Sequence, residues 1–405
     1  MPGRMFTGQL SEGSMPRHLA IIASHPIQYH APLFRELTRR IDIKVFFAHR
    51  QTAAGQGAAG FGVGFDWDID LLSGYEHQFL ENVASQPGLD RFSGVDTPEI
   101  GKHLSEGRFD ALLVMGWHLK CYVQAVMAAK RLGLSVMVRG DSHLATPRSA
   151  IKRLGKRLLY PWLLKQFDTV LYVGKRSRAY YEHYDYPAER LFFSPHCVDN
   201  AFFADRATPA VGNELRKRIG IAVSDRVLLF AGKLVPFKRP LDLVNAAAEL
   251  CQRDRPVHIL VAGAGELEGD LTRRSVERGV PLYHLGFQNQ SEMPAAYAAA
   301  DVLVLPSDGR ETWGLVVNEA LACGRPVMVS DACGCAPDLV ADGRAGAVFP
   351  MGDVCTLANG LEQLLERPPG RDDIAAKAHD YSLERAMDGL CEALDFLTMK
   401  TVCDR

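Results

Sequence analysis

The sequence lacks any apolar run long enough to cross a membrane, and it has no excess of charge of either sign. A spanning helix requires about 18 consecutive apolar residues, and the apolar run at residues 19–23 is short and is followed almost at once by His25. This run therefore predicts a β-strand rather than a signal sequence. The formal net charge of the 405-residue chain is -2, so no overall field draws the protein to nucleic acid. We expect a cytoplasmic globular protein without a nucleic-acid partner.

The sequence also lacks the cysteine pattern of a disulfide framework or a zinc site. Its nine cysteines are scattered and odd in number, which is typical of reduced thiols in the cytoplasm. Cys333 and Cys335 form the only close pair, with no second pair or histidine at zinc spacing. The acids of D-W-D-I-D, residues 66–70, alternate with apolar residues, which favours a half-exposed strand over a metal-binding Asp-x-Asp motif. The sequence therefore predicts no metal and no bound cofactor.

Apolar runs that alternate with longer helical runs predict an α/β fold. A chain of 405 residues exceeds one ordinary hydrophobic core and is expected to form two domains. Runs that predict buried strands lie at 19–24, 43–48, 111–115, 134–138, 169–173, 227–231, 257–262, 302–305 and 326–330. Helical runs such as 32–40 and 122–132 separate them, which is the pattern of parallel sheets covered on both faces. We predict two Rossmann-like, doubly wound domains that face a central cleft at the carboxyl ends of their strands.

The predicted domain boundary lies near residues 199–212, where proline, glycine and small residues interrupt the periodicity. We place the first domain at 17–205 and the second at 206–384. Residues 1–16 are rich in Gly, Ser and Met and predict a flexible tail. Residues 385–405 predict a C-terminal helix that packs back on the first domain.

The most informative segment is D-G-R-E-T-W-G-L-V-V-N-E at residues 308–319, which follows an apolar run and opens a helical one. If residues 313–315 begin the helix, their free N–H groups and the helix dipole form an anion site. Glu311 then lies on the loop before that site, and Glu319 lies farther along the helix. A diphosphate between them would leave one carboxylate for the ribose and one for the sugar of a nucleotide sugar. The alternative is a loop glutamate beside a solvated helix glutamate.

Three further features follow strands of the second half. Lys233 and Lys238 stand in G-K-L-V-P-F-K, where two ammonium groups would neutralise a departing diphosphate; the alternative is a pair of solvated loop lysines. Gly263 lies in A-G-A-G-E and would permit close approach of the backbone to a ligand, or simply a tight turn. Residues 286–289 end another short strand, where exposed backbone could pair with a base.

Together these residues resemble glycosyltransferase family 4, whose members have the GT-B architecture of two Rossmann-like domains. Over residues 191–353, G-K-L-V-P-F-K is similar to the family's diphosphate-binding turn, E-T-W-G-L-V-V-N-E to its Glu-x7-Glu signature, F-F-S-P-H-C-V-D to its interdomain segment and C-G-C-A-P-D-L-V to the loop that follows. The resemblance implies that Glu311 contacts the donor sugar and Glu319 the ribose, and that two lysines bind the diphosphate. The implied donor site comprises Gly232, Lys233, Lys238, Gly263, Phe287, Glu311, Thr312, Trp313, Gly314, Leu315 and Glu319.

The chain departs from the family at two places. Lys233 stands where the family usually has arginine, so a bidentate fork is replaced by a point charge. The first strand leads into S-H-P-I-Q-Y-H instead of a Gly-rich turn. The side chains expected at the cleft or acceptor side are His25, Gln28, Tyr29, His30, Arg139 and Asp141.

His118 ends the third expected strand of the first domain. Its position resembles that of the family's histidine near the donor sugar. We therefore predict His118 as a catalytic group together with Glu311, Lys238 and Lys233. The alternative is a packed or exposed loop histidine.

The resemblance implies a retaining glycosyltransferase that moves a sugar from a nucleoside-diphosphate sugar to a saccharide or lipid-linked acceptor. The run H-P-I-Q-Y-H-A-P-L-F-R-E-L is similar to members linked to surface polysaccharides, which points to polysaccharide or glycoconjugate biosynthesis. Three alternatives are a nucleotide-sugar epimerase on the same fold, a transferase acting on a soluble small-molecule acceptor, and a non-catalytic nucleotide-sugar sensor.

A basic amphipathic segment lies in the first half, at residues 148–165. Its apolar residues at helical spacing are Ile151, Leu154, Leu158 and Trp162, and the basic residues beside them are Lys152, Arg153, Lys156 and Arg157. Such a helix binds an anionic surface at the inner face of a membrane, or it packs its apolar side on the core and leaves the basic side in solvent. Pro161 predicts a bend or an end of the helix.

Overall fold

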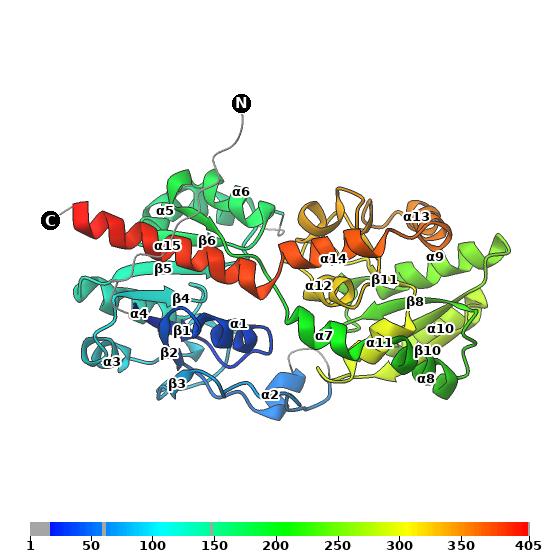
Figure 1. The fold of residues 1–405 in the computed structure, drawn as a ribbon, viewed down its shortest axis with the longest axis horizontal. Helices are drawn as coiled ribbons and strands as arrows, with labels where there is room; N and C mark the ends of the chain where they lie inside the picture. Colours follow the sequence, from blue (N-terminus) through cyan, green and yellow to red (C-terminus); the bar gives the residue numbers. More distant parts are fainter. Residues whose placement is uncertain (1–16, 59–61, 146–148, 404–405) are drawn as a thin grey trace.

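The computed structural model describes residues 17–58, 62–145 and 149–403, and it contains two parallel β-sheets flanked by helices (Figure 1). The seven-stranded sheet has the order β3-β2-β1-β4-β5-β6-β7, and the six-stranded sheet has the order β10-β9-β8-β11-β12-β13. This confirms the predicted α/β class with two doubly wound sheets. The predicted tail at residues 1–16 lies outside the described residues, as does Arg148.

All of the expected strands are present. The first sheet consists of β1 (His18–Ala23), β2 (Asp42–Phe47), β3 (Glu76–Phe79), β4 (Ala111–Val114), β5 (Ser135–Gly140), β6 (Thr169–Tyr172) and β7 (Leu191–Phe193). The second consists of β8 (Arg226–Ala231), β9 (Val257–Ala262), β10 (Leu282–Gly286), β11 (Val302–Leu305), β12 (Val327–Ser330) and β13 (Gly346–Phe349). The strands that were not predicted, β3, β7 and β13, lie at sheet edges. β3 and β7 contain no fully buried residue, so they give no continuous apolar run.

The helices alternate with these strands on both faces of each sheet. In the first half they are α1 (His30–Leu37), α2 (Ala53–Ala58), α3 (Ile100–Glu106), α4 (Lys120–Arg131), α5 (Ala150–Leu164), α6 (Lys175–His183) and α7 (Asn200–Arg206). In the second half they are α8 (Pro209–Ile219), α9 (Pro240–Gln252), α10 (Glu268–Arg278), α11 (Met293–Ala299), α12 (Leu315–Ala322), α13 (Val354–Glu366), α14 (Arg371–Asp380) and α15 (Leu383–Cys403).

Strand β1 shows why both faces of the sheet are covered. Successive side chains of a strand point to opposite faces. Ala20 and Ile22 pack in a core with residues of α3 and α4, whereas Leu19 and Ile21 pack in a second core with residues of α1 and α15. A strand that is buried on both faces reads as a continuous apolar run, which is the pattern expected of parallel sheets.

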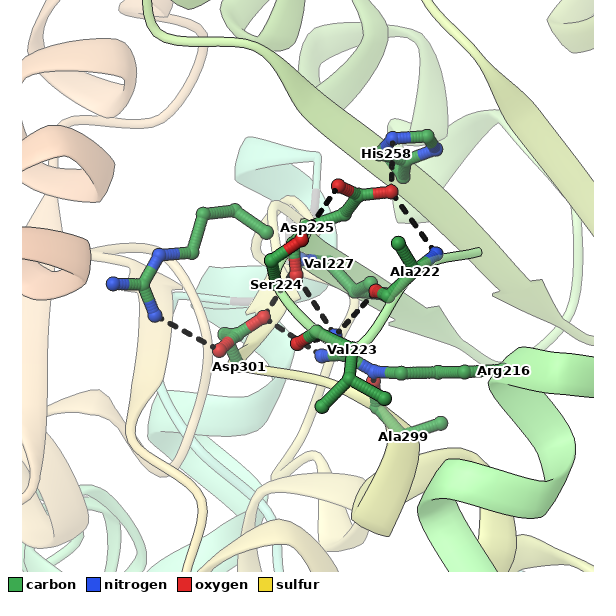
Figure 2. A network of polar contacts seen from close by, with 10 residues as sticks. Arg216, Ala222, Val223, Ser224, Asp225, Val227, His258, Ala299 and Asp301 are labelled. Atoms are coloured by element: carbon green, nitrogen blue, oxygen red, sulfur yellow. Dashed lines mark hydrogen bonds and ion pairs between the residues drawn. The ribbon is translucent and has the colours of Figure 1, made fainter. Parts of the chain in front are cut away.

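A buried ion pair fixes the amino-terminal edge of the second sheet (Figure 2). Arg216 of α8 donates from Nε to the carbonyl oxygen of Ala299 at 2.7 Å and from Nη2 to the Asp301 carboxylate at 2.9 Å. Asp301 also accepts from the backbone N–H of Val227 at 2.8 Å, and Arg216 donates to the carbonyl oxygen of Asp225 at 2.8 Å. Because a buried charge is tolerated only when it is paired and hydrogen-bonded, this network stabilises the edge opposite the carboxyl ends of the strands.

The chain passes from one domain to the other through helices. Residues 199–212, where an interrupted pattern was expected, contain α7 and the start of α8, and Phe203 is buried in a core with residues of α11 and α12. Helix α15, red in Figure 1, lies along the first domain in contact with α1, β6 and β7. A Cβ on Gly389 would lie 1.7 Å from the carbonyl oxygen of Phe193. Glycine therefore lets α15 and β7 meet at backbone distance.

Helix α5 differs from expectation in two respects. It continues past Pro161 to Leu164, so the proline does not end it. The core-facing interpretation is also wrong, because Leu164 is the buried residue of this helix and Ile151 is 85% exposed.

No helix in the described part of the chain is long and apolar enough to span a bilayer. Across the same residues, no group of three or more His, Cys, Asp or Glu is arranged to hold a metal ion.

Candidate active site

Two turns at the carboxyl edge of the second sheet bring Lys238 and Glu311 together. Lys238 ends the 3-10 turn η3 (Pro236–Lys238) after β8, and Glu311 lies in the loop between β11 and α12. The backbone N–H of Asp308 donates to the carbonyl oxygen of Phe237 at 2.8 Å, which fixes one turn against the other. Lys238 and Glu311 form an ion pair, and each side chain is 12% exposed. Lys238 is therefore not a solvated loop lysine.

The surroundings of this pair come from the second domain. The hydroxyl of Ser307, which is fully buried, donates to Glu311 Oε2 at 3.1 Å. Burial lowers the pKa of Lys233, and the nearby positive charge of Lys238 lowers it further. Two ammonium groups and one carboxylate thus share a partly desolvated corner. Ser307 could not be predicted from the sequence, because a single serine after a strand carries no motif.

Gly263 allows the ends of β8 and β9 to approach each other at backbone distance. Its φ is +154°, and a Cβ there would lie 1.8 Å from the carbonyl oxygen of Gly232. The N–H of Gly232 donates to the carbonyl oxygen of Ala262 at 2.9 Å, and that of Gly263 donates to Gly286 at 2.8 Å. This approach of two strand ends accounts for glycine at position 263, and its predicted role at a ligand stays a prediction. Gly232 is beside the ion pair, since a Cβ on it would lie 3.9 Å from Lys238 Nζ.

Helix α12 begins at Leu315, with Gly314 at its N-cap and a φ of +102°. Of the predicted start at residues 313–315, only Leu315 is helical. Trp313 is 4% exposed, and its Nε1 donates to Asn318 Oδ1 at 2.8 Å. A Cβ on Gly174 of the first domain would lie 2.4 Å from the Trp313 ring, so this indole packs between the domains. Its side chain is not available to a donor, and only its backbone is left for the predicted role.

Glu319 is held by two tyrosines that come from different domains. Tyr29 of the first domain donates its hydroxyl to Glu319 Oε1 at 2.8 Å, and Tyr297 of the second donates to Oε2 at 2.5 Å. Glu319 is 2% exposed, and burial raises its pKa to about 7 although both tyrosine hydrogen bonds lower it. The resemblance assigns this carboxylate to the ribose, yet both of its oxygens already accept hydrogen bonds in this structure. Tyr29 was expected on the acceptor side, but its hydroxyl is hydrogen-bonded to Glu319, which was predicted to bind the donor.

The loop after β1 lines a pocket between the domains. Gln28 and Tyr29 of the first domain, Phe202 of α7 and Gln290 of the second domain border a cavity of about 170 Å³. The cavity lies beside the Tyr29–Glu319 hydrogen bond. Gln28 and Tyr29 of S-H-P-I-Q-Y-H therefore reach the space between the domains, and their predicted place at the acceptor stays a prediction.

Three histidines of the first domain were predicted at the site, His25 and His30 at the cleft and His118 as a catalytic group, and burial lowers the pKa of each. Burial lowers the pKa of His25 to about 4 and the pKa of His30 to about 3, so both imidazoles are neutral at pH 7. His25 Nδ1 lies 3.0 Å from the hydroxyl of Ser24. His118 lies on the loop after β4, and partial burial of its ring lowers its pKa.

Arg139 lies near the end of β5 and Asp141 directly follows that strand, but the two side chains have different surroundings. Arg139 is 4% exposed and donates from Nη2 to the carbonyl oxygen of Pro195 at 2.6 Å, so it packs inside the first domain instead of facing an open cleft. Asp141 Oδ2 accepts from the hydroxyl of Thr312 at 2.7 Å and lies 3.9 Å from His196 Nε2. Asp141 therefore connects the first domain to the Glu-x7-Glu segment.

A loop of the first domain, residues 66–70, contacts the segment that follows β10 in the second domain. The expectation of a half-exposed strand at residues 66–70 is wrong, because this segment is a loop. Its Asp66 carbonyl oxygen accepts from Asn289 Nδ2 at 2.8 Å, and the Asp68 carboxylate accepts from the N–H of Ser291 at 3.2 Å. Asp68 thus binds the second domain with its carboxylate, whereas the Asp70 carboxylate accepts from the N–H of Leu72 within the first domain.

Phe65, next to this loop, contacts Phe287. Their ring centroids are 4.2 Å apart. Phe287 was predicted at the donor base, and the contact with Phe65 comes from the opposite domain. Nothing in the spacing of the sequence relates residues that lie so far apart along the chain, so this contact could not be predicted.

Comparison with known proteins relates this site to glycosyl transferases. Residues 212–381 match the family described as Glycosyl transferases group 1. D-inositol 3-phosphate glycosyltransferase of Corynebacterium aurimucosum is 32% identical over 223 residues, which are 53% of this chain and 52% of that protein. GDP-mannose-dependent alpha-(1-6)-phosphatidylinositol monomannoside mannosyltransferase of Mycolicibacterium smegmatis is 31% identical over 239 residues, 56% of this chain and 59% of that one. The chain spans about half the length of the relatives that it matches.

Solved structures extend the similarity of fold over nearly the whole chain. HepE of Anabaena in complex with UDP has a TM-score of 0.70 at 18% identity and covers 94% of this chain and 100% of its own. WaaG, a glycosyltransferase involved in lipopolysaccharide biosynthesis, has a TM-score of 0.59 at 17% identity, with coverage of 91% and 94%. The solved structures show the expected GT-B fold, and residues 212–381 match the group 1 family, which is consistent with the resemblance to family 4.

Proposed function

We propose that this protein is a retaining glycosyltransferase that transfers a sugar from a nucleoside-diphosphate sugar to a saccharide or lipid-linked acceptor. The observation that carries the proposal is the Lys238–Glu311 pair, formed at the carboxyl edge of the sheet within the segment that matches group 1 glycosyl transferases. Ligands of doubly wound sheets bind at this edge. We further propose that the protein works in the cytoplasm, in cell-surface polysaccharide or glycoconjugate biosynthesis.

In the proposed reaction the donor separates the two members of this pair. Lys238 and Lys233 would bind the diphosphate, and Glu311 would accept hydrogen bonds from the sugar hydroxyls. The bond between the anomeric carbon and the diphosphate oxygen breaks, and the acceptor oxygen bonds to the same face of that carbon. The leaving diphosphate takes the acceptor proton. Two ammonium groups in a partly desolvated corner would stabilise the charge that develops on the leaving group.

At the other end of the donor, the ribose would compete with Tyr29 for Glu319. The Tyr29 hydroxyl occupies Oε1, and a ribose hydroxyl is the same kind of donor. Aromatic contact at Phe287 supports a place for the base near the end of β10. The donor would thus extend from Glu311, past the start of α12, to Phe287.

The acceptor would enter from the first domain. His25, Gln28 and His118 lie on loops that follow the carboxyl ends of β1 and β4. Among the similar proteins, one is named for transfer to D-inositol 3-phosphate and another for transfer to a phosphatidylinositol monomannoside. These names support acceptors of both kinds, a small polar molecule and a lipid-linked saccharide.

A panel of nucleotide sugars tests the proposal. Each donor is incubated with the full chain, and release of free nucleoside diphosphate is measured with and without a pool of saccharide and lipid-linked acceptors. Acceptor-dependent release with at least one donor, lost in Glu311→Gln, is the expected result. Formation of an isomerised nucleotide sugar without any acceptor would instead establish an epimerase. Tight binding without turnover against every acceptor would establish a sensor.

A further inference from the structure

Helix α5 presents a row of large apolar side chains to solvent. The exposed fractions are 85% for Ile151, 61% for Leu154, 71% for Leu158, 64% for Leu159 and 68% for Trp162. Single exposed apolar residues are ordinary on protein surfaces, but a contiguous group of this kind marks an interaction site. Figure 1 shows α5 on the outside of the first domain, next to α6.

The helix is oriented with its apolar side outward. Ile151, Leu154, Leu158 and Trp162 are three or four residues apart and so share one face. The opposite side holds the helix to the domain: Leu164 is buried, and Lys156 donates to the Tyr180 hydroxyl at 3.1 Å. A helix that belonged only to the core would be turned the other way.

Positive charge flanks the apolar face. Lys152 and Arg157 are both exposed and stand on either side of it, and Arg153 and Lys165 are exposed nearby. Residues 148–165 contain no aspartate or glutamate, although the whole chain has a formal net charge of -2. The charge is therefore local to this helix. An apolar face between basic residues is complementary to a bilayer surface with anionic headgroups, where the basic side chains reach the phosphates and the apolar ones enter the acyl boundary.

We propose that α5 docks the protein on an anionic lipid surface, with the helix lying in the plane of the headgroups and Leu154, Leu158 and Trp162 inserted. At about 1.5 Å per residue, the helix of 15 residues extends far enough along the surface to contact several lipids. The purpose of the docking rests on the proposed function, since a transferase on this surface would meet a lipid-linked acceptor there. The docking itself does not depend on catalysis.

Sedimentation with lipid vesicles tests the docking. The full chain is mixed with phosphatidylcholine vesicles or with vesicles of phosphatidylcholine and phosphatidylglycerol, at low and at high salt. We expect recovery with the anionic vesicles at low salt, and a marked loss of binding at high salt because the headgroup attraction is screened. Recovery in the supernatant under every condition, or equal binding to both kinds of vesicle, would overturn the proposal.

Substitutions in α5 test whether this helix makes the contact with the lipid vesicles. Lys152→Gln/Arg157→Gln should lower partitioning by about fivefold per residue, and Leu158→Gln/Trp162→Gln should lower it further. Val276→Gln, at a 77% exposed position on α10 of the second domain, is the matched control and should bind as the unaltered protein does. Equal binding of the α5 variants and the control would overturn the assignment.

Two more measurements separate the possible causes of a negative result. Hydrolysis of a nucleotide sugar should be unchanged in the α5 variants, because none of the substituted residues belongs to the candidate active site. Loss of this activity together with binding would mean that the substitutions damage the fold and would overturn the assignment. Size-exclusion chromatography that shows a dimer, abolished by Leu158→Gln/Trp162→Gln, would assign the face to a second copy instead. Vesicle binding without turnover of any donor would contradict the proposed function and leave the docking intact.

Discussion

The two carboxylates of the Glu-x7-Glu segment are eight residues apart in the chain, yet they lie in opposite environments. Glu311 is bound by a lysine and a serine of its own domain. Glu319 has no cation beside it among the described residues and is bound by two tyrosines, one of which belongs to the other domain. The first end of the segment is therefore an ion pair inside one domain, and the second is a contact between two domains that contains no ion pair among the described residues. A motif fixes which residue types are present, but the neighbours decide what each of them does.

The largest expected effect is at the Glu311 end. Lys238→Ala should lower the turnover number by about two to three decades, because it removes a charge that would stabilise the leaving diphosphate. Steady-state kinetics with the donor from the panel measures this. Lys217→Ala, at an exposed position on α8, is the matched control. Unchanged turnover in a folded Lys238→Ala protein would remove this lysine from the mechanism.

Glu319 should make the free energy of unfolding depend on pH. The pKa of Glu319 is raised from 4.5 to about 7, so the folded protein binds its proton more tightly than the unfolded chain. The free energy of unfolding should therefore fall as pH rises through this interval, by about 2 to 3 kcal/mol between pH 5 and 8. Because the amide in Glu319→Gln does not titrate, the free energy of unfolding of this variant should not fall over this interval. Urea unfolding at both pH values compares it with Glu214→Gln, an exposed control, and parallel falls in the two variants would contradict the assignment.

Ligand selectivity should distinguish the two carboxylates directly. Glu319→Ala should weaken free nucleoside diphosphate and nucleotide sugar alike, because both contain the ribose. Glu311→Ala should weaken only the nucleotide sugar, by about tenfold or more, since the hydrogen bonds to a charged group that it loses are made by the sugar. Titration calorimetry with the two ligands measures both. Equal losses for both ligands in both variants would remove the division of roles.

Much of the second domain could be predicted from the sequence, whereas the contacts between domains could not. The buried strands are continuous apolar runs, and the turn with Lys238 and the loop with Glu311 follow them directly, so local pattern and resemblance located both. The Asp66–Asn289 and Tyr29–Glu319 contacts join residues that are far apart in the chain. Periodicity describes only local structure, so it mistook the loop at residues 66–70 for a strand. The apolar residues of α5 had the right spacing for a helix, but spacing does not say which way a helix faces.

The smallest expected effect tests the contact that joins the two domains. In Tyr29→Phe, the hydroxyl that occupies Glu319 Oε1 is absent, and a ribose hydroxyl no longer has to displace it. Since a hydrogen bond contributes a net 0.5–1.5 kcal/mol, roughly, the variant should bind free nucleoside diphosphate about fivefold more tightly.

Tyr297→Phe is the matched control for this prediction. It removes the other phenol from Glu319 but leaves the contact between the domains in place, so it should not tighten binding. Calorimetric titration of the three proteins with the same nucleoside diphosphate compares them. Equal tightening in both variants would mean that Glu319 is freed by the loss of either phenol. Weaker binding in Tyr29→Phe would show that Tyr29 orients Glu319 toward the ribose, and the contact between the domains would then belong to the donor site itself.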